Sequence, residues 1–95
     1  MPPVIRQSAD LTAGHSCFPP TIYVQGSGNV FINGLPVVRK SDIIKVHCCP
    51  LGPCHLGQSV AISSVYVNGL DITKAGDAIS CGDVSMGGSG NVSVG

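Results

Sequence analysis

The chain has 95 residues, a length typical of one small domain. Five Lys and Arg residues balance five Asp residues, so the chain lacks the basic surface needed to bind nucleic-acid phosphates. No apolar run approaches the ~20 residues that span a bilayer, and the N-terminus resembles no secretory signal. We therefore expect synthesis in the cytoplasm without a signal peptide.

The composition favours an all-β fold with a small core. Twelve Val and eight Ile dominate the apolar residues, and β-branched side chains suit strands better than helices. There is no Glu and little Ala, whereas thirteen Gly and seven Pro indicate many turns. Only two Phe and two Tyr are available for the core, so a domain of this size is expected to need a staple.

The first repeated segment lies near the N-terminus. Residues 3–8 (PVIRQS) match residues 36–41 (PVVRKS), and at the other end of the chain residues 88–95 match residues 26–32. The two terminal segments are therefore the second and first halves of one repeat, divided between the chain ends.

Two further copies each contain a predicted β-hairpin. Residues 30–39 and 65–74 place an Asn-Gly pair between β-branched residues, at 33–34 and at 68–69. Asn-Gly is a strong hairpin signal because a type I′ turn needs two residues that tolerate positive φ. Three copies predict a pseudo-threefold arrangement; the alternative is a chance similarity among segments rich in Gly, Val and Asn.

Each copy leads into an aspartate, at Asp10, Asp42 and Asp77. These carboxylates could serve catalysis or metal binding. Their recurrence at equivalent turns instead favours carboxylates that accept backbone N–H groups.

Candidate metal ligands follow these aspartates. His15 and His47 each come five residues after an aspartate, and Cys81 comes four residues after one. Around a common axis these side chains would converge, and the insert after His47 offers His55 as a fourth ligand. Three imidazoles and one thiolate suit tetrahedral Zn²⁺. Because four protein ligands leave no open position, we expect one structural Zn²⁺.

The remaining cysteines leave the ligand set open. They are Cys17, Cys48, Cys49 and Cys54. Any of them could replace a histidine, because thiolate is a good zinc ligand, or could be a small buried apolar residue. An odd number of cysteines without a signal peptide makes a disulfide framework the weaker interpretation and metal binding the stronger.

An enzyme is the less favoured class of function. Cys54 beside His55 could be a nucleophile and a base, but neighbours in sequence seldom have that geometry. Neither a G-x-S-x-G nor an H-E-x-x-H motif occurs. We expect no catalytic activity and no small-molecule substrate.

The combined pattern resembles the PAAR-repeat proteins. The resemblance rests on residues 26–39 (GSGNVFINGLPVVR), followed by a Ser-Asp turn at 41–42 that leads to His47. The namesake Pro-Ala-Ala-Arg corresponds to Pro-Val-Val-Arg at 36–39 and Pro-Val-Ile-Arg at 3–6. The resemblance covers nearly the whole chain and is specific only as a combination.

This resemblance implies a short cone of folded β-hairpins with zinc near its apex. It further implies that one cone caps each trimeric β-helix, either the VgrG protein of type VI secretion or the central spike of a contractile-tailed phage. The capped spike contacts the target membrane transiently while it pierces the envelope, so the protein would be part of a phage tail or exported by type VI secretion. We expect a single domain over residues 1–95 without a fused effector.

We expect the spike to bind the hairpin strands, which lie far along the repeat from the ligands. The predicted contact residues are Val30, Phe31, Ile32, Val65, Tyr66 and Val67. The alternative function is a zinc-binding interaction module for an unrelated partner.

Overall fold

Residues 1–94 are described by the computed structural model, and their regular structure is entirely β. Six strands of two residues each form three antiparallel hairpins, β1–β2, β3–β4 and β5–β6. The strands are β1 (Phe31–Ile32), β2 (Leu35–Pro36), β3 (His47–Cys48), β4 (Cys54–His55), β5 (Tyr66–Val67) and β6 (Leu70–Asp71). No helix long and apolar enough to cross a membrane occurs in this part of the chain.

The two predicted Asn-Gly hairpins are present. Asn33 and Gly34 connect β1 to β2 with φ values of 56° and 78°, and Asn68 and Gly69 connect β5 to β6 with φ values of 55° and 78°. Positive φ at both central residues is the conformation that a type I′ turn requires, and Asn and Gly adopt it at low cost.

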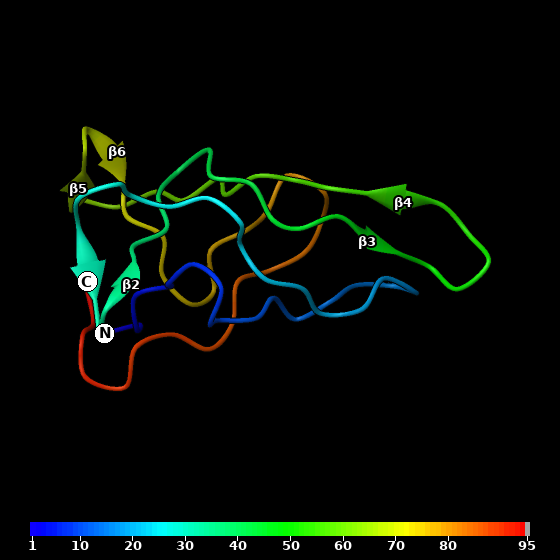
Figure 1. The fold of residues 1–95 in the computed structure, drawn as a ribbon, viewed down its shortest axis with the longest axis horizontal. Coiled ribbons are helices and arrows are strands. Elements are labelled where there is room, and N and C mark those ends of the chain that lie inside the picture. The colour runs from blue at the N-terminus through cyan, green and yellow to red at the C-terminus, as the bar shows by residue number, and fades with distance from the viewer. Residues whose placement is uncertain (95) are drawn as a thin grey trace.

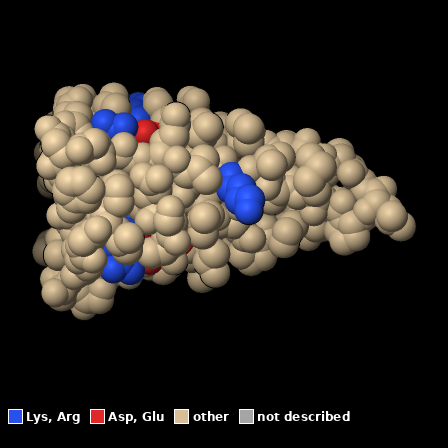
Figure 2. Space-filling model, viewed as in Figure 1, with Lys and Arg blue, Asp and Glu red and all other residues tan. Residues whose placement is uncertain are grey.

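The molecule tapers along its length, with principal extents of 38 × 23 × 22 Å. Hairpins β1–β2 and β5–β6 gather with both chain termini at the broad end, which we call the base (Figure 1). Hairpin β3–β4 protrudes at the opposite, narrow end, which we call the apex. On the face drawn in Figure 2, charged side chains lie over the base and the middle, and the apex carries none.

A closed cycle of three backbone hydrogen bonds joins the three copies of the repeat. The amide of Ile5 donates to the carbonyl of Thr73, at 3.0 Å. The amide of Thr73 donates to Val38 at 3.0 Å, and the amide of Val38 returns to Ile5 at 3.1 Å. All three residues are fully buried. The predicted pseudo-threefold arrangement is therefore present, with the N-terminal segment supplying the third copy.

The C-terminal segment completes that third copy. The amide of Val4 donates to the carbonyl of Val92 at 3.0 Å, as the amide of Val37 does to Val30 at 3.1 Å in another copy. The two ends of the chain thus reproduce a pairing that a continuous hairpin makes elsewhere.

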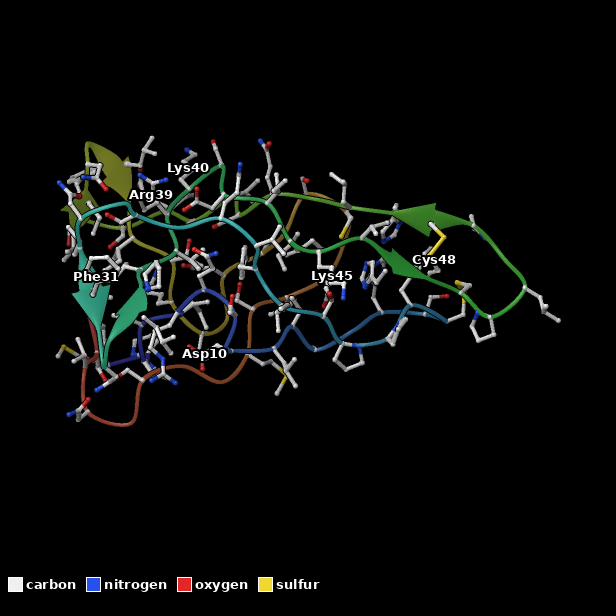
Figure 3. All side chains as sticks on the ribbon, viewed as in Figure 1. Asp10, Phe31, Arg39, Lys40, Lys45 and Cys48 are labelled. Carbon is white, nitrogen blue, oxygen red and sulfur yellow. A yellow bond between two sulfur atoms is a disulfide. The ribbon has the colours of Figure 1, made fainter. Side chains whose placement is uncertain are left out.

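Each copy also carries an ion pair between a basic residue and the aspartate at its turn. The pairs are Arg6–Asp10, Arg39–Asp42 and Lys74–Asp77. In all three the carboxylate also accepts the backbone amide of its basic partner, at 2.7–2.8 Å. Figure 3 labels Asp10 and Arg39 on the flank of the cone. The interpretation of these aspartates as turn acceptors is confirmed.

The buried side chains form two small clusters. One lies along the axis and consists of Ile5, Tyr23, Val38, Ile44 and Ile79. The other lies near the base and consists of Val4, Val37, Val67 and Ile72. Cys81 packs against the first cluster, so one candidate metal ligand is attached directly to the core.

Candidate metal centre

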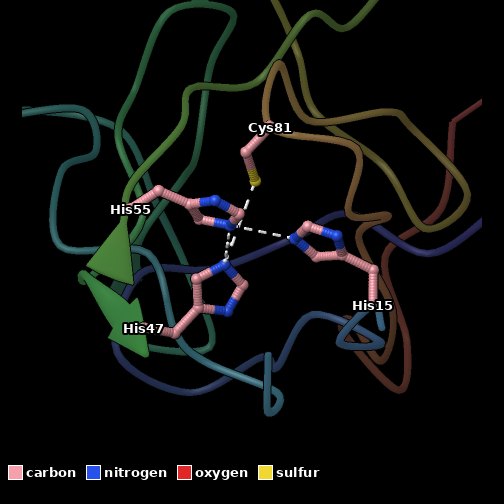
Figure 4. A group of neighbouring side chains, drawn as sticks. All are labelled: His15, His47, His55 and Cys81. Carbon is pink, nitrogen blue, oxygen red and sulfur yellow. Dashed lines mark hydrogen bonds between the residues drawn. The ribbon is translucent and has the colours of Figure 1, made fainter. Parts of the chain in front are cut away.

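The structure brings together the four predicted ligands His15, His47, His55 and Cys81 near the apex (Figure 4). One ligand atom from each residue lies within 4.8 Å of all the others. The Nε2 atom of His55 is 2.7 Å from that of His47 and 3.0 Å from that of His15. The Sγ atom of Cys81 lies 4.0 Å from Nε2 of His47.

Hairpin β3–β4 places two of the imidazoles. His47 and His55 are directly opposite in the antiparallel register. Side chains of opposite residues project from the same face of a pair of strands, so the two rings are close neighbours. His47 is 4% exposed and His55 is half-buried. The pairing of the two short strands therefore fixes the relative positions of His47 and His55.

A tight turn positions His15. The backbone amides of His15 and Phe18 donate to each other's carbonyl oxygens at 3.0 and 2.8 Å. Gly14 enters the turn with a φ of +78°, and a Cβ atom there would lie 2.9 Å from the Phe18 carbonyl oxygen. Any side chain at residue 14 would therefore both strain the backbone and collide with the turn.

Gly57 provides the space that Cys81 occupies. A Cβ atom at residue 57 would lie 3.0 Å from the Cys81 Sγ atom, 3.0 Å from its backbone nitrogen and 2.9 Å from Cγ2 of Ile79. Cys81 is the one free cysteine among the described residues, so its thiol is available as a ligand. The close approach of these two segments requires glycine.

The hydrogen bond of His47 leaves its inner nitrogen free to bind a metal. Nδ1 of His47 lies 2.8 Å from the carbonyl oxygen of Pro19. A carbonyl can only accept, so Nδ1 carries the proton and Nε2 presents a lone pair to the group. Ligating histidines commonly use their second nitrogen in this way. The donor set therefore fits a bound cation.

The electrostatic surroundings of the group are mixed. Partial burial, followed by the neighbouring His47 and His15 rings, lowers the pKa of His55, which favours the neutral imidazole that binds metals. Asp83 is 1% exposed, and its Oδ2 atom makes no hydrogen bond within residues 1–94. Asp83 acts in the opposite sense and tends to raise the pKa of His55.

Phe18 is a part of the site that the sequence pattern did not predict. Its ring stacks on His55 with centroids 3.7 Å apart, and on His15 with centroids 5.0 Å apart. The ring thus covers two imidazoles and restricts their orientations. The one feature of the sequence that could have indicated this role is the position of Phe18 three residues after the predicted ligand His15.

The other four cysteines form two disulfides, Cys17–Cys49 and Cys48–Cys54. This differs from the expectation that metal binding rather than disulfide formation accounts for the cysteines, and from the alternative in which one of them replaces a histidine. The reason is the register of β3–β4, which sets Cys48 opposite Cys54. Figure 3 shows the sulfur–sulfur bond of Cys48 on the apical hairpin.

The residues predicted to contact the spike divide into two groups. At the base, Phe31 is 54% and Tyr66 is 61% exposed, and Val30 and Val65 are also exposed. Val67 is buried in the cluster near the base, against which Ile32 packs. The first group can meet a partner, whereas the second contributes mainly to the core. Binding at this face stays a prediction.

Fold and site together define a small all-β cone with a candidate metal centre of three histidines and one cysteine at its apex. A model of the family described as PAAR motif matches residues 24–87. The chain belongs to the PAAR motif family. The matched segment contains His47, His55 and Cys81, whereas His15 and the divided third copy lie outside it. No curated protein matches the chain.

Proposed function

We propose that this protein is a structural cap on the tip of a trimeric β-helical spike, VgrG-like or from a contractile phage tail. One cap sits on each trimer, and its apex leads the spike through the target envelope. Membership of the PAAR motif family supports a role associated with a spike. The observation that carries the proposal is the closed hydrogen-bond cycle of Ile5, Thr73 and Val38, because it gives one chain a threefold base.

A threefold base on a single chain solves a specific geometric problem. The end of a trimeric β-helix exposes unpaired strand edges, which invite aggregation unless they are covered. Three related copies can meet three equivalent subunits while the opposite end converges to one point. At the base, Phe31 and Tyr66 occupy equivalent positions in their copies and project into solvent, and exposed aromatic rings are frequent anchors in interfaces.

The metal centre supplies rigidity to the apex. We propose that His15, His47, His55 and Cys81 hold one structural Zn²⁺. A structural zinc site in a small peptide is worth on the order of 10–16 kcal/mol, comparable to the whole stability of an ordinary domain. Four protein ligands leave no position for a substrate or a reactive water, so the role is structural rather than catalytic.

Delivery follows from the same proposal. The cap is made in the cytoplasm, joins the spike there and leaves the cell within a phage tail or through type VI secretion. It contacts the target membrane only while the spike passes through it.

The test is co-purification with a candidate spike. A trimeric β-helical protein encoded beside this gene is co-expressed with the cap, and the complex is weighed by native mass spectrometry. We expect one cap for three spike chains. A Phe31→Asp, Tyr66→Asp variant should lose the complex while it keeps its metal and melting temperature, and Leu51→Ala at the exposed apex is the matched control. A symmetric homo-oligomer without affinity for the spike would instead indicate a zinc-binding interaction module.

A further inference from the structure

We infer that the two apical disulfides raise the affinity of the metal centre by holding its three histidines in place, without changing the ligand set. The inference rests on the metal centre of the proposed function and adds a dependence on redox state. Each histidine ligand lies within two residues of a disulfide: His15 precedes Cys17, His47 precedes Cys48, and His55 follows Cys54.

Hairpin β3–β4 has little apolar packing to keep it ordered. Within residues 1–94, neither buried cluster contains a residue of β3 or β4. Its flanking apolar side chains Val46 and Leu56 are 48% and 54% exposed, and Leu51 at its tip is fully exposed. An isolated two-stranded hairpin is at best marginally stable in water. Besides the stacking of Phe18 on His55, covalent and metal cross-links therefore keep this hairpin ordered.

The two disulfides connect the segments that carry the imidazoles. Cys48–Cys54 closes the hairpin next to the opposed pair His47 and His55. Cys17–Cys49 joins the turn of His15 to the same hairpin across 32 residues of sequence. Cys81 needs no such link because it packs against the core. Oxidation thus assembles the three imidazoles, and the ion connects them to the fourth ligand.

The strand cysteines Cys48 and Cys54 cannot readily become ligands themselves. Successive residues of a strand point to opposite faces, and accordingly His47 is buried whereas Cys48 is exposed. Cys54 is likewise exposed beside the half-buried His55. Reduction of Cys48–Cys54 therefore leaves the three-histidine, one-thiolate set unchanged and removes only one constraint on it.

The redox step is a thiol–disulfide exchange with a low-molecular-weight thiol. Its thiolate attacks one sulfur of Cys48–Cys54, which forms a mixed disulfide and releases one cysteine thiolate. A second thiol then attacks the mixed disulfide, which yields the second cysteine thiol and a small-molecule disulfide. Two electrons pass from the small thiols to the protein. The exposure of Cys48 and Cys54 makes this pair accessible to the reaction.

The consequence is a difference in metal affinity between the two states. In the reduced protein, metal binding must order the hairpin and the turn of His15, and that ordering opposes binding. In the oxidised protein the disulfides have already restricted both segments. A disulfide that closes a loop of this kind corresponds to about 10²-fold in an equilibrium constant. We expect the oxidised protein to bind Zn²⁺ about 10²-fold more tightly than the reduced protein.

The experiment measures metal affinity and thiolate number in parallel. Zn²⁺ affinity is measured by competition with a chromophoric chelator, for the oxidised protein and after reduction by a phosphine. Co²⁺ is then substituted, and its thiolate charge-transfer absorbance is compared between the two states. The Cys48→Ser, Cys54→Ser variant removes one of the two disulfides without a reductant. Hydrogen exchange at Ile5, Val38 and Thr73 checks that the base stays folded.

We expect the reduced protein and the double-serine variant to bind Zn²⁺ more weakly than the oxidised protein. The Co²⁺ absorbance should correspond to a single thiolate ligand in every form. Equal affinity in the two states overturns the coupling but leaves the metal centre standing. An added thiolate band in the reduced wild type that is absent from the double variant also overturns it, because the cysteines would then be ligands. Failure of the oxidised wild type to bind either metal, with the same result for Cys81→Ser, overturns the metal centre and the coupling together.

Discussion

His47 and His55 face each other across β3–β4 with their Nε2 atoms 2.7 Å apart. Nε2 of His55 is also 3.0 Å from that of His15. A single ring N–H can donate well to one acceptor only, and the proton of His47 is already committed to Pro19 through Nδ1. Protons alone therefore cannot satisfy the three nitrogens, whereas one cation can accept a lone pair from each.

Removing one imidazole should release the metal. We expect His47→Ala to lose its single equivalent of Zn²⁺ and to lower the free energy of unfolding by several kcal/mol, because metal binding and folding of the apex are coupled. Native mass spectrometry and thermal denaturation measure the two effects. Leu51→Ala, at a fully exposed apical position, is the control and should change neither. A His47→Ala protein with full metal content and an unchanged melting temperature would contradict the ligand set.

Two Gly→Ala substitutions, one at a crowded position and one at an open position, test whether close packing requires glycine at residue 57. Gly57→Ala should weaken metal binding and stability, because the new Cβ lies 3.0 Å from Sγ of Cys81 and 2.9 Å from the Ile79 side chain. Overpacking of this kind typically costs about 1–3 kcal/mol. Gly28→Ala adds the same methyl group where no atom lies within 4 Å. Chelator competition and denaturant unfolding should show a loss in the first variant alone; equal behaviour would refute the packing argument.

The ion pair of Arg6 and Asp10 should make stability depend on acid pH. Burial acts to raise the pKa of Asp10, but hydrogen bonds from the Arg6 side chain and backbone outweigh it, so the pKa lies below its ordinary value. The stabilisation is therefore present above the unfolded pKa of about 3.9 and is lost as the pH falls through the lower folded value.

We expect Asp10→Asn to cost about 1–3 kcal/mol at pH 7 and progressively less below pH ~4. Urea unfolding between pH 2 and 7 measures the difference. Lys40→Gln changes the net charge by one unit at an exposed position and is the control. A cost for Asp10→Asn that persists unchanged at the lowest pH would show that the carboxylate charge is not what stabilises the turn.

The phenol of Tyr23 should lose its proton only at a pH well above the pKa of an ordinary tyrosine. Burial raises its pKa to about 12, even though the Ser85 hydroxyl lies 2.9 Å from its phenol oxygen. The folded state holds its proton longer than the unfolded state, so stability should fall as the pH rises from about 10 towards 12. Tyr66→Phe leaves Tyr23 as the one tyrosine of the chain, which makes its absorbance titration unambiguous. A midpoint near 10 in the folded variant would show that the phenol is not shielded.

The hairpins, the repeat and the candidate ligands could be predicted from the sequence because the relevant signals are local or repeated. The Asn-Gly pair at 33–34 forms its turn whatever lies around it, since the two residues supply the positive φ that the turn needs. The recurrence of Arg6 as Arg39 and Lys74 implies three copies around an axis. Once the copies share an axis, the similar separation of four or five residues from aspartate to ligand brings His15, His47 and Cys81 to one end of it.

Other features depend on distances between segments far apart in the chain, so only the tertiary structure decided them. The pairing of Cys17 with Cys49 follows from where the turn of His15 meets the apical hairpin. The stacking of Phe18 on His55 and the space that Gly57 leaves for Cys81 have the same origin. A sequence pattern states which residues recur and which turns they favour. Which side chains touch across the axis is set by packing, because contact requires the segments to approach within a few ångströms.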